Sequence, residues 1–275
     1  TVLMKAAGNG HPDVVKWLIE QGVDINSKSG KGTTPLMFAA NSGNVDILKI
    51  LVTNGADINA RADNGVSALS RAVGTGHLEA VKWLIEHGAD VQSKRDDGTT
   101  LLIEAANGGF GDVVQLLVDK GVDVNETTAE GTSPLIVAAQ YGHLGVIQFL
   151  VEHGADIKAK HSDGRTPLMV AALCGHRDVV EWLANQGAEI EGEDKDGKTA
   201  LMLAKDNGHW DVVEFLAKRD AIKPDDFQAL QKSAEAGDPT AQFNLGMAYA
   251  EGVGVPQDYK TAAKWLHMAA EQGVA

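Results

Sequence analysis

Two short helical patterns alternate along most of the chain. In each period a leucine is followed three residues later by an alanine, and this pair lies on one face of a helix of about two turns. A second apolar pattern at helical spacing follows, as in Val14, Val15, Leu18 and Ile19, before a polar turn. The pattern predicts an all-α chain built from pairs of short helices.

The period of this pattern is 33 residues. Three positions recur at this period: a glycine, a hydroxyl residue two positions later, and a leucine two positions after that. The glycines are Gly32, Gly65, Gly98, Gly131, Gly164 and Gly197, and the hydroxyl residues are Thr34, Ser67, Thr100, Ser133, Thr166 and Thr199, with Thr1 in the same phase. Each hydroxyl is predicted to cap a first helix, because its oxygen can accept a hydrogen bond from an unpaired amide.

Helix pairs this short cannot bury their apolar faces alone, so they are expected to stack as an α-solenoid. Gly-x-Thr-Pro-Leu-x-x-Ala-Ala, then Gly-His, then Gly-Ala-Asp-Ile-Asn resembles the ankyrin repeat. The resemblance covers residues 1–222 as a partial first repeat followed by 27–59, 60–92, 93–125, 126–158, 159–191 and 192–222. The family's usual histidine after Pro-Leu is replaced at each repeat, which leaves the hydrogen bonds between neighbours open.

The period changes after residue 222. In residues 225–275, Ala-Glu-Ala-Gly recurs as Ala-Glu-Gln-Gly at an offset of 36, with two helical patterns between the copies. This region resembles the Sel-one-like repeat, a relative of the tetratricopeptide pair, with one complete copy at about 237–272. The chain starts and stops inside repeats, so it is expected to be part of a longer protein.

Net charge and hydropathy restrict the kind of partner. The chain holds 24 Lys and Arg against 38 Asp and Glu, a formal charge of −14, and no local basic stripe is visible. Nucleic acid is therefore not expected as a partner. The longest apolar runs are far shorter than the roughly 20 residues that span a bilayer, so membrane insertion is not expected. A soluble, cytoplasmic protein is favoured, whereas export as an effector or a periplasmic location stays open.

No residue pattern indicates catalysis, a metal or a cofactor. Five of the nine histidines occupy one repeated position, namely His11, His77, His143, His176 and His209, and no histidine pair has ligand spacing. The sequence shows no evident base to activate Cys174, so it gives no indication of nucleophilic catalysis. Trp17, Trp83 and Trp182 recur at one phase of the second helix and are expected in the core. The chain is predicted not to be an enzyme.

Positions that the repeat does not fix are the candidates for recognition. In ankyrin-like stacks, the turn tips and the exposed side of the first helix form a concave face that binds proteins. On the first helices, the candidates are Phe38, Arg71, Glu104, Val137, Tyr141, Val170 and Leu173; at the tips they are Asp97, Glu130, Asp163 and Asp196. The acidic tips would suit a basic partner, and the apolar group a hot spot. Two alternatives are that Asp-Gly simply favours turns and that the apolar residues are buried against the next repeat.

We therefore predict a non-catalytic scaffold or adaptor that binds a partner protein with a basic or apolar patch, plausibly within a larger complex. The alternative is a targeting or regulatory segment of a larger enzyme or secreted bacterial effector. The combination of the two repeat types resembles bacterial proteins.

Overall fold

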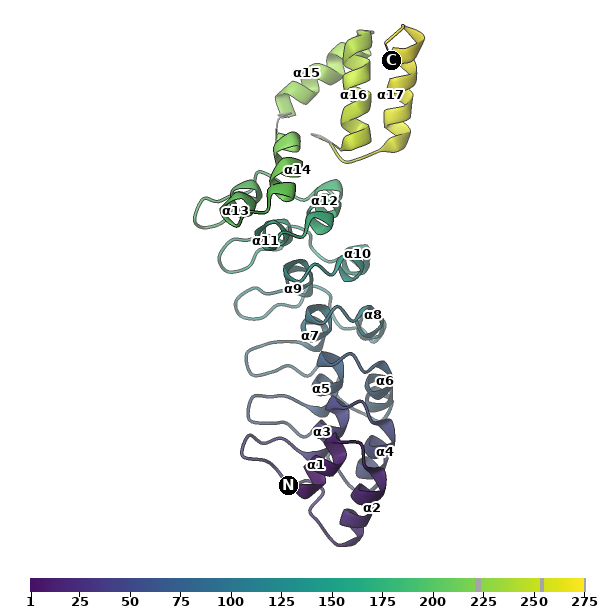
Figure 1. Ribbon diagram of the computed structural model, residues 1–275, viewed down its shortest axis with the longest axis vertical. Helices are drawn as coiled ribbons and strands as arrows, with labels where there is room; N and C mark the ends of the chain where they lie inside the picture. Colours follow the sequence, from purple (N-terminus) through teal and green to yellow (C-terminus); the bar gives the residue numbers. More distant parts are fainter. Residues whose placement is uncertain (221–223, 253–254, 275) are drawn as a thin grey trace. The chain divides into compact units, whose positions relative to one another are not determined.

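The computed structural model describes residues 1–220, 224–252 and 255–274, which contain seventeen α-helices (Figure 1). These residues contain no strand and one isolated bridge, between Lys94 and Thr100. By their contacts they divide into two units, Thr1–Ala138 with His143–Asp156, and Ala139–Gly142 with Ile157–Ala275. The boundary expected at 222–225 falls partly on residues 221–223, outside the described residues, and stays a prediction.

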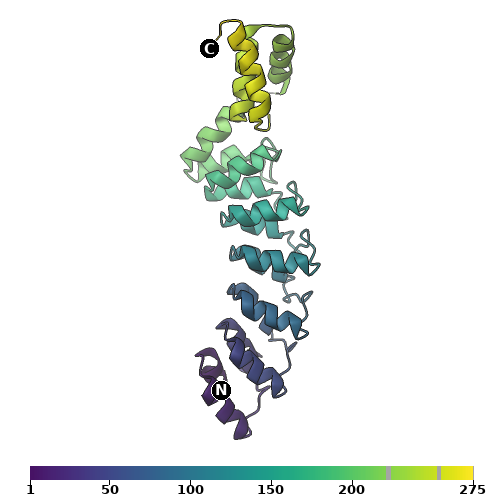
Figure 2. The same cartoon turned by 90° about the vertical axis from the view of Figure 1, so that its right-hand side faces the viewer.

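The first unit is a series of short helix pairs. It contains α1 (Val2–Gly8), α2 (Pro12–Glu20), α3 (Pro35–Asn41), α4 (Val45–Thr53), α5 (Ala68–Gly74), α6 (Leu78–Glu86), α7 (Leu101–Asn107), α8 (Gly111–Asp119), α10 (Leu144–Glu152) and most of α9 (Pro134–Gln140). The second helices α2, α4, α6 and α8 lie side by side in Figure 2. The expected helix pairs of the 33-residue period are therefore present.

The core of each pair comes from the repeated Leu and Ala positions. Leu69 and Leu102 are at most 1% exposed, and Ala72 and Ala105 are fully buried. The small alanines allow neighbouring first helices to approach, and α3 and α5 contact each other directly. This confirms the buried stripe expected from the sequence.

The tryptophans differ from the expectation of a core role. Trp17 is 58% exposed, while Trp83 and Trp182 are half-buried. The reason is geometric: Leu18 is directly next to Trp17 and is buried, and successive positions on a helix point about 100° apart.

Hydroxyl residues cap the first helices in six of the seven repeats. The backbone amide three residues on donates to the hydroxyl oxygen of Thr1, Ser67, Thr100, Ser133, Thr166 and Thr199, at 3.1 to 3.4 Å. At α3 the cap residue Thr34 makes no such bond. The expected cap is thus confirmed at six positions and wrong at Thr34.

The second unit contains two further helix pairs and a C-terminal group of three longer helices. The pairs are α11 (Pro167–Cys174) with α12 (Arg177–Asn185), and α13 (Ala200–Asp206) with α14 (Trp210–Asp220). Met202 of α13 is 50% exposed, whereas the equivalent Met169 of α11 is fully buried. The described residues therefore place no further repeat over this face of α13.

The C-terminal helices α15 (Pro224–Glu235), α16 (Pro239–Glu251) and α17 (Tyr259–Glu271) pack on one another. Their buried cluster comprises Phe227, Ala234, Ala241, Leu245 and Ala248. Gly246 lets α17 approach α16 closely, because a Cβ at this position would lie 2.7 Å from Cγ of Leu266. Asp238 and Asp258 cap α16 and α17 with their carboxylates. We call α15–α17 the C-terminal helices below.

Candidate interaction surface

The first-helix candidates differ in exposure. Phe38 is 38% exposed and Arg71 is half-buried, but Glu104, Val137 and Val170 are at most 8% exposed. The buried valines fit the alternative of packing against the adjoining repeat. They are thus not accessible side chains in this structure, and their role in partner binding stays a prediction.

The second unit contains an exposed apolar group at the end of its first helices. Tyr141 is 50% exposed, and Leu173 and Cys174 are half-buried. Burial raises the pKa of the Cys174 thiol. A raised pKa lowers the fraction of reactive thiolate at neutral pH.

The acidic tips are placed in turns, as Asp-Gly sequences favour. Asp97, Glu130 and Asp196 are exposed, and Asp163 is half-buried. The Thr99 backbone amide donates to the Asp97 carboxylate at 2.9 Å, and hydrogen bonds from Thr99 hold the pKa of Asp97 below its usual value. These bonds fit the alternative in which the acidic residue serves its own turn.

Asp163 is also used locally. Its carboxylate is 3.0 Å from Nδ1 of His161 and 3.3 Å from Arg165. Burial acts to raise its pKa, but the Arg165 backbone amide, His161 and the Arg165 guanidinium lower it overall. Arg165 also pairs with the buried Asp194 at 3.3 Å. The tip at Asp163 is therefore less available to a basic partner than the tips at Asp97, Glu130 and Asp196.

Glu104 is a buried acid rather than an exposed contact. It forms an ion pair with Arg95, and its second oxygen has no hydrogen-bond partner among the described residues. Burial raises the pKa of Glu104 to about 7, although the nearby Arg95 and Arg71 act to lower it. The structure thus corrects its placement on an accessible face.

Histidines and one phenylalanine join neighbouring repeats. Nε2 of His77 lies 3.2 Å from the carbonyl oxygen of Asn41, thirty-six residues earlier, at the end of the preceding first helix. His143, His176 and His209 bond the carbonyls of Asn107, Gln140 and Leu173 in the same way, at 2.9 to 3.1 Å. The bonds between neighbours therefore exist, but they come from the histidine after the glycine, not from the family's usual position.

Each such ring lies against a glycine of the preceding repeat. Two features favour glycine there: a positive φ and the lack of space for a side chain. Gly109 has φ +68°, and an added Cβ would lie 2.7 Å from the His143 ring. At Gly76 the ring is that of Phe110, 2.5 Å from an added Cβ. The ring of one repeat thus occupies the space that a side chain would need in the previous one.

Asparagine amides form a second set of links. Nδ2 of Asn125 donates to the carbonyl of Gly154 at 2.9 Å, and its Oδ1 accepts from the amide of Asp156 at 2.8 Å. Asn26 and Asn59 make equivalent pairs of bonds. Asn26, Asn59 and Asn125 share one phase of the 33-residue period, and this shared phase is the sequence signal that marks these links.

Arg219 of α14 is a residue that sequence reasoning missed. It is 4% exposed and donates to the carbonyls of Gly252 and Val255 and to Oδ1 of Asn185. Gly252 ends α16, so the guanidinium interacts with the C-terminus of that helix, where a cation is favoured. Arg219 is not part of the pattern that recurs every 33 residues, so no sequence signal marks it.

The described ranges hold neither a metal-binding cluster nor a membrane-spanning helix. Those residues contain no group of three or more His, Cys, Asp or Glu side chains placed to hold a metal ion. In the same ranges, every helix is too short or too polar to cross a membrane.

The stacked pairs, cross-linked by ring and amide bonds, define an α-solenoid repeat protein. The chain belongs to the ankyrin repeat family: the family model "Ankyrin repeats (3 copies)" matches residues 3–95, 91–161 and 156–228. A Sel1 repeat model matches residues 239–274. Both repeats are protein–protein interaction modules and are typically non-catalytic.

A solved structure of similar fold is that of the human ASB11 ankyrin repeat domain. The TM-score is 0.69 at 29% sequence identity, over 74% of this chain and 91% of that chain. No curated protein matches the chain in sequence.

Proposed function

We propose that this chain is a binding scaffold that holds a partner protein against the face formed by the first helices and turn tips. The observation that carries the proposal is the partly exposed apolar group of Tyr141, Leu173 and Cys174 at positions that the repeat leaves variable. Aromatic and aliphatic side chains in such positions carry much of the energy of an interface.

The repeated residues are already used within the protein. The ring of His209 bonds the carbonyl of Leu173, and the ring of His176 bonds that of Gln140. These bonds fix the backbone at the ends of α9 and α11, while the side chains of Tyr141 and Leu173 retain exposed surface. A rigid backbone lowers the ordering cost of binding, which supports recognition at these positions.

The test is replacement of both apolar side chains. The native partner is first isolated from the source organism with the wild-type chain and purified. Tyr141→Ala with Leu173→Ala is then expected to raise the dissociation constant for that partner more than tenfold, well over 1 kcal/mol, by calorimetry.

Trp17→Ala is the matched control, because Trp17 is exposed to a similar degree on a second helix. It is expected to leave the affinity unchanged. An equal loss with Trp17→Ala, or none with the double variant, would reject the first-helix face as the binding site.

The acidic tips give a second, smaller contribution. Asp97, Glu130 and Asp196 are exposed and of one sign, so a basic segment of the partner is the expected complement. If they contribute, affinity falls with added salt, and Glu130→Gln reduces this salt dependence.

The proposal that the chain is the targeting segment of a larger enzyme or secreted effector concerns residues outside it. The complete reading frame tests it directly: a catalytic constellation beyond these repeats is expected if it is right.

A further inference from the structure

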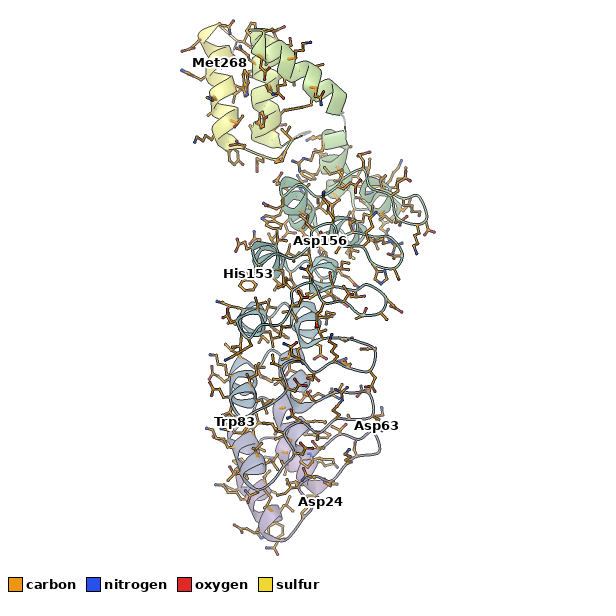
Figure 3. All side chains as sticks on the ribbon, turned by 180° about the vertical axis from the view of Figure 1, so that it is seen from behind. Asp24, Asp63, Trp83, His153, Asp156 and Met268 are labelled. Carbon is orange, nitrogen blue, oxygen red and sulfur yellow. The ribbon has the colours of Figure 1, made fainter. Side chains whose placement is uncertain are left out.

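A polar cleft of about 510 Å³ lies between the loops that precede α3 and α5. Lys28 and Thr34 line it from the first loop, and Asp57, Asn59 and Arg61 from the second. Figure 3 labels Asp24 in the first of these loops and Asp63 in the second, and places Trp83 on the opposite, second-helix side. The whole cleft belongs to the first unit and shares no residue with the face proposed above.

Thr34 is the exception among the repeated hydroxyl residues. The other six accept a hydrogen bond from the first turn of their own helix, but Oγ1 of Thr34 has no partner among the described residues. Thr34 is only 2% exposed. A buried hydroxyl without a partner is unfavourable, so a ligand that accepts a hydrogen bond from it would be stabilised here.

Lys28 is also an exception at its position. Arg61, thirty-three residues on, pairs with Asp96 at 3.3 Å, and Lys94 pairs with Glu126 at 2.8 Å. No ion pair of Lys28 occurs in the part of the chain that the structure describes. The cleft therefore contains a lysine that is not paired with its equivalent acid, Asp63, and a hydroxyl that makes no bond to its own helix.

The other polar groups of the lining are engaged. The Asn59 side chain bonds Gly88 and Asp90, the Asp57 carboxylate accepts from the Asn59 amide at 3.0 Å, and Arg61 donates to the Lys94 carbonyl at 2.6 Å. The Lys28 ammonium and the Thr34 hydroxyl have no such partner among the described residues, and both are donors. An acceptor with one negative charge matches them, because the Asp57 carboxylate disfavours a second charge.

We propose that this cleft binds the carboxylate of an acidic side chain from a partner protein. The ammonium of Lys28 contacts one carboxylate oxygen, and the hydroxyl of Thr34 donates to the other. The whole chain carries a formal charge of −14 and repels an acidic segment, so such a segment is directed to this local exception.

The probe for this site is N-acetyl-glutamate N-methylamide, compared with its glutamine analogue. Titration into the ¹⁵N-labelled protein is expected to give saturable shifts at the amides of Lys28 and Thr34 with the glutamate compound alone. Lys28→Gln and Thr34→Val are each expected to weaken this binding at least tenfold.

Lys31→Gln is the charge control, because Lys31 is an exposed lysine of the same loop outside the lining. It is expected to change the affinity less than twofold. Equal loss with Lys31→Gln, or equal shifts with the glutamine compound, would overturn the site. Tighter binding of a blocked phosphoserine would overturn the choice of a singly charged ligand.

Stability measurements separate binding from folding. Thr34→Val is expected to leave the melting temperature unchanged, because this hydroxyl makes no cap bond, whereas Thr100→Val lowers it. An equal loss for both would show that Thr34 is an ordinary cap and would reject the proposal. The outcome does not depend on the first-helix face, since the probe is a blocked glutamate rather than the partner protein and the variants lie in the first unit.

Discussion

The ankyrin repeats and the C-terminal helices reach stability by different means. In the repeats, helices of seven to eleven residues depend on links to the next repeat, through rings such as His77 and amides such as Asn59. In the C-terminal helices, α16 and α17 of thirteen residues each pack directly along their length around Leu245 and Gly246. Short helices thus need polar cross-links to fix their register, whereas long helices can do so with close side-chain packing.

The largest expected effect comes from replacing one buried leucine in each region by alanine, which tests this contrast. Leu102→Ala and Leu245→Ala each remove a fully buried side chain and are expected to cost about 2–5 kcal/mol. Hydrogen exchange measured by mass spectrometry should show Leu102→Ala loosening α5 and α7, and Leu245→Ala loosening α15–α17. Deprotection of α5 and α7 by Leu245→Ala would mean that the two regions unfold as one, against the contrast.

The next effect is the pH dependence of the repeats. Glu104 has its pKa raised to about 7 from an ordinary 4.5, mainly by burial. Between these values the folded protein binds the proton more tightly than the unfolded chain does, so the free energy of unfolding falls as pH rises, by about 3 kcal/mol in all. Urea titrations at pH 4.5 to 7.5 are expected to show this fall, and Glu104→Gln to remove it.

Carboxylates with lowered pKa act in the opposite sense and elsewhere. The carboxylates of Asp97, Asp163 and Asp194 stabilise the folded protein above the pKa that they have in the unfolded chain. This stabilisation is lost as pH drops through their pKa values in the folded protein, below about pH 4. Their contribution therefore does not hide that of Glu104. An unchanged pH slope in Glu104→Gln would contradict the assignment.

Two glycines sharpen the comparison of packing. Gly246→Ala places a Cβ 2.7 Å from Leu266 between α16 and α17 and is expected to cost about 1–3 kcal/mol. Gly145→Ala in α10 meets nothing within 4 Å and is expected to gain up to about 1 kcal/mol from helix propensity. Thermal unfolding measures both, and a loss at Gly145 would show that the second helices also depend on close approach.

The smallest expected effect concerns one amide link. Asn125→Ala removes two bonds between repeats and is expected to cost about 1–2 kcal/mol. Asn54→Ala is the control, because that side chain bonds only the carbonyl of Ile50 in its own helix. Equal costs would mean that links between repeats contribute no more than local bonds.

Most of the fold could be predicted from the sequence because the same residue pattern recurs in every repeat. The glycine, hydroxyl, leucine and alanine positions predicted the helix pairs and their buried stripe, and each copy supported the others. Trp17 shows the limit of this reasoning: its neighbour Leu18 points inward and Trp17 does not, a difference of one helical position that composition alone does not resolve.

The candidate site was predicted less well, because exposure depends on side-chain contacts that the phase of the repeat does not specify. Glu104 and Phe38 occupy the same repeat position, but Arg95 covers the first and leaves it buried, whereas the second stays 38% exposed. Arg219 was missed because its partners are backbone carbonyls, which have no sequence signature. Thr34 resembles six equivalent residues in sequence and differs only in its hydrogen bonding.

The links between repeats have a consequence for how such a chain can change in evolution. Each ring bond spans 36 residues and each amide bond 29 or 31, so a link joins a repeat to its immediate neighbour and to no other. Duplication or deletion of one whole 33-residue segment would therefore reconnect the same donors with the same acceptors. Loss of any other number of residues would separate them, so whole repeats are the units in which this chain can lengthen or shorten.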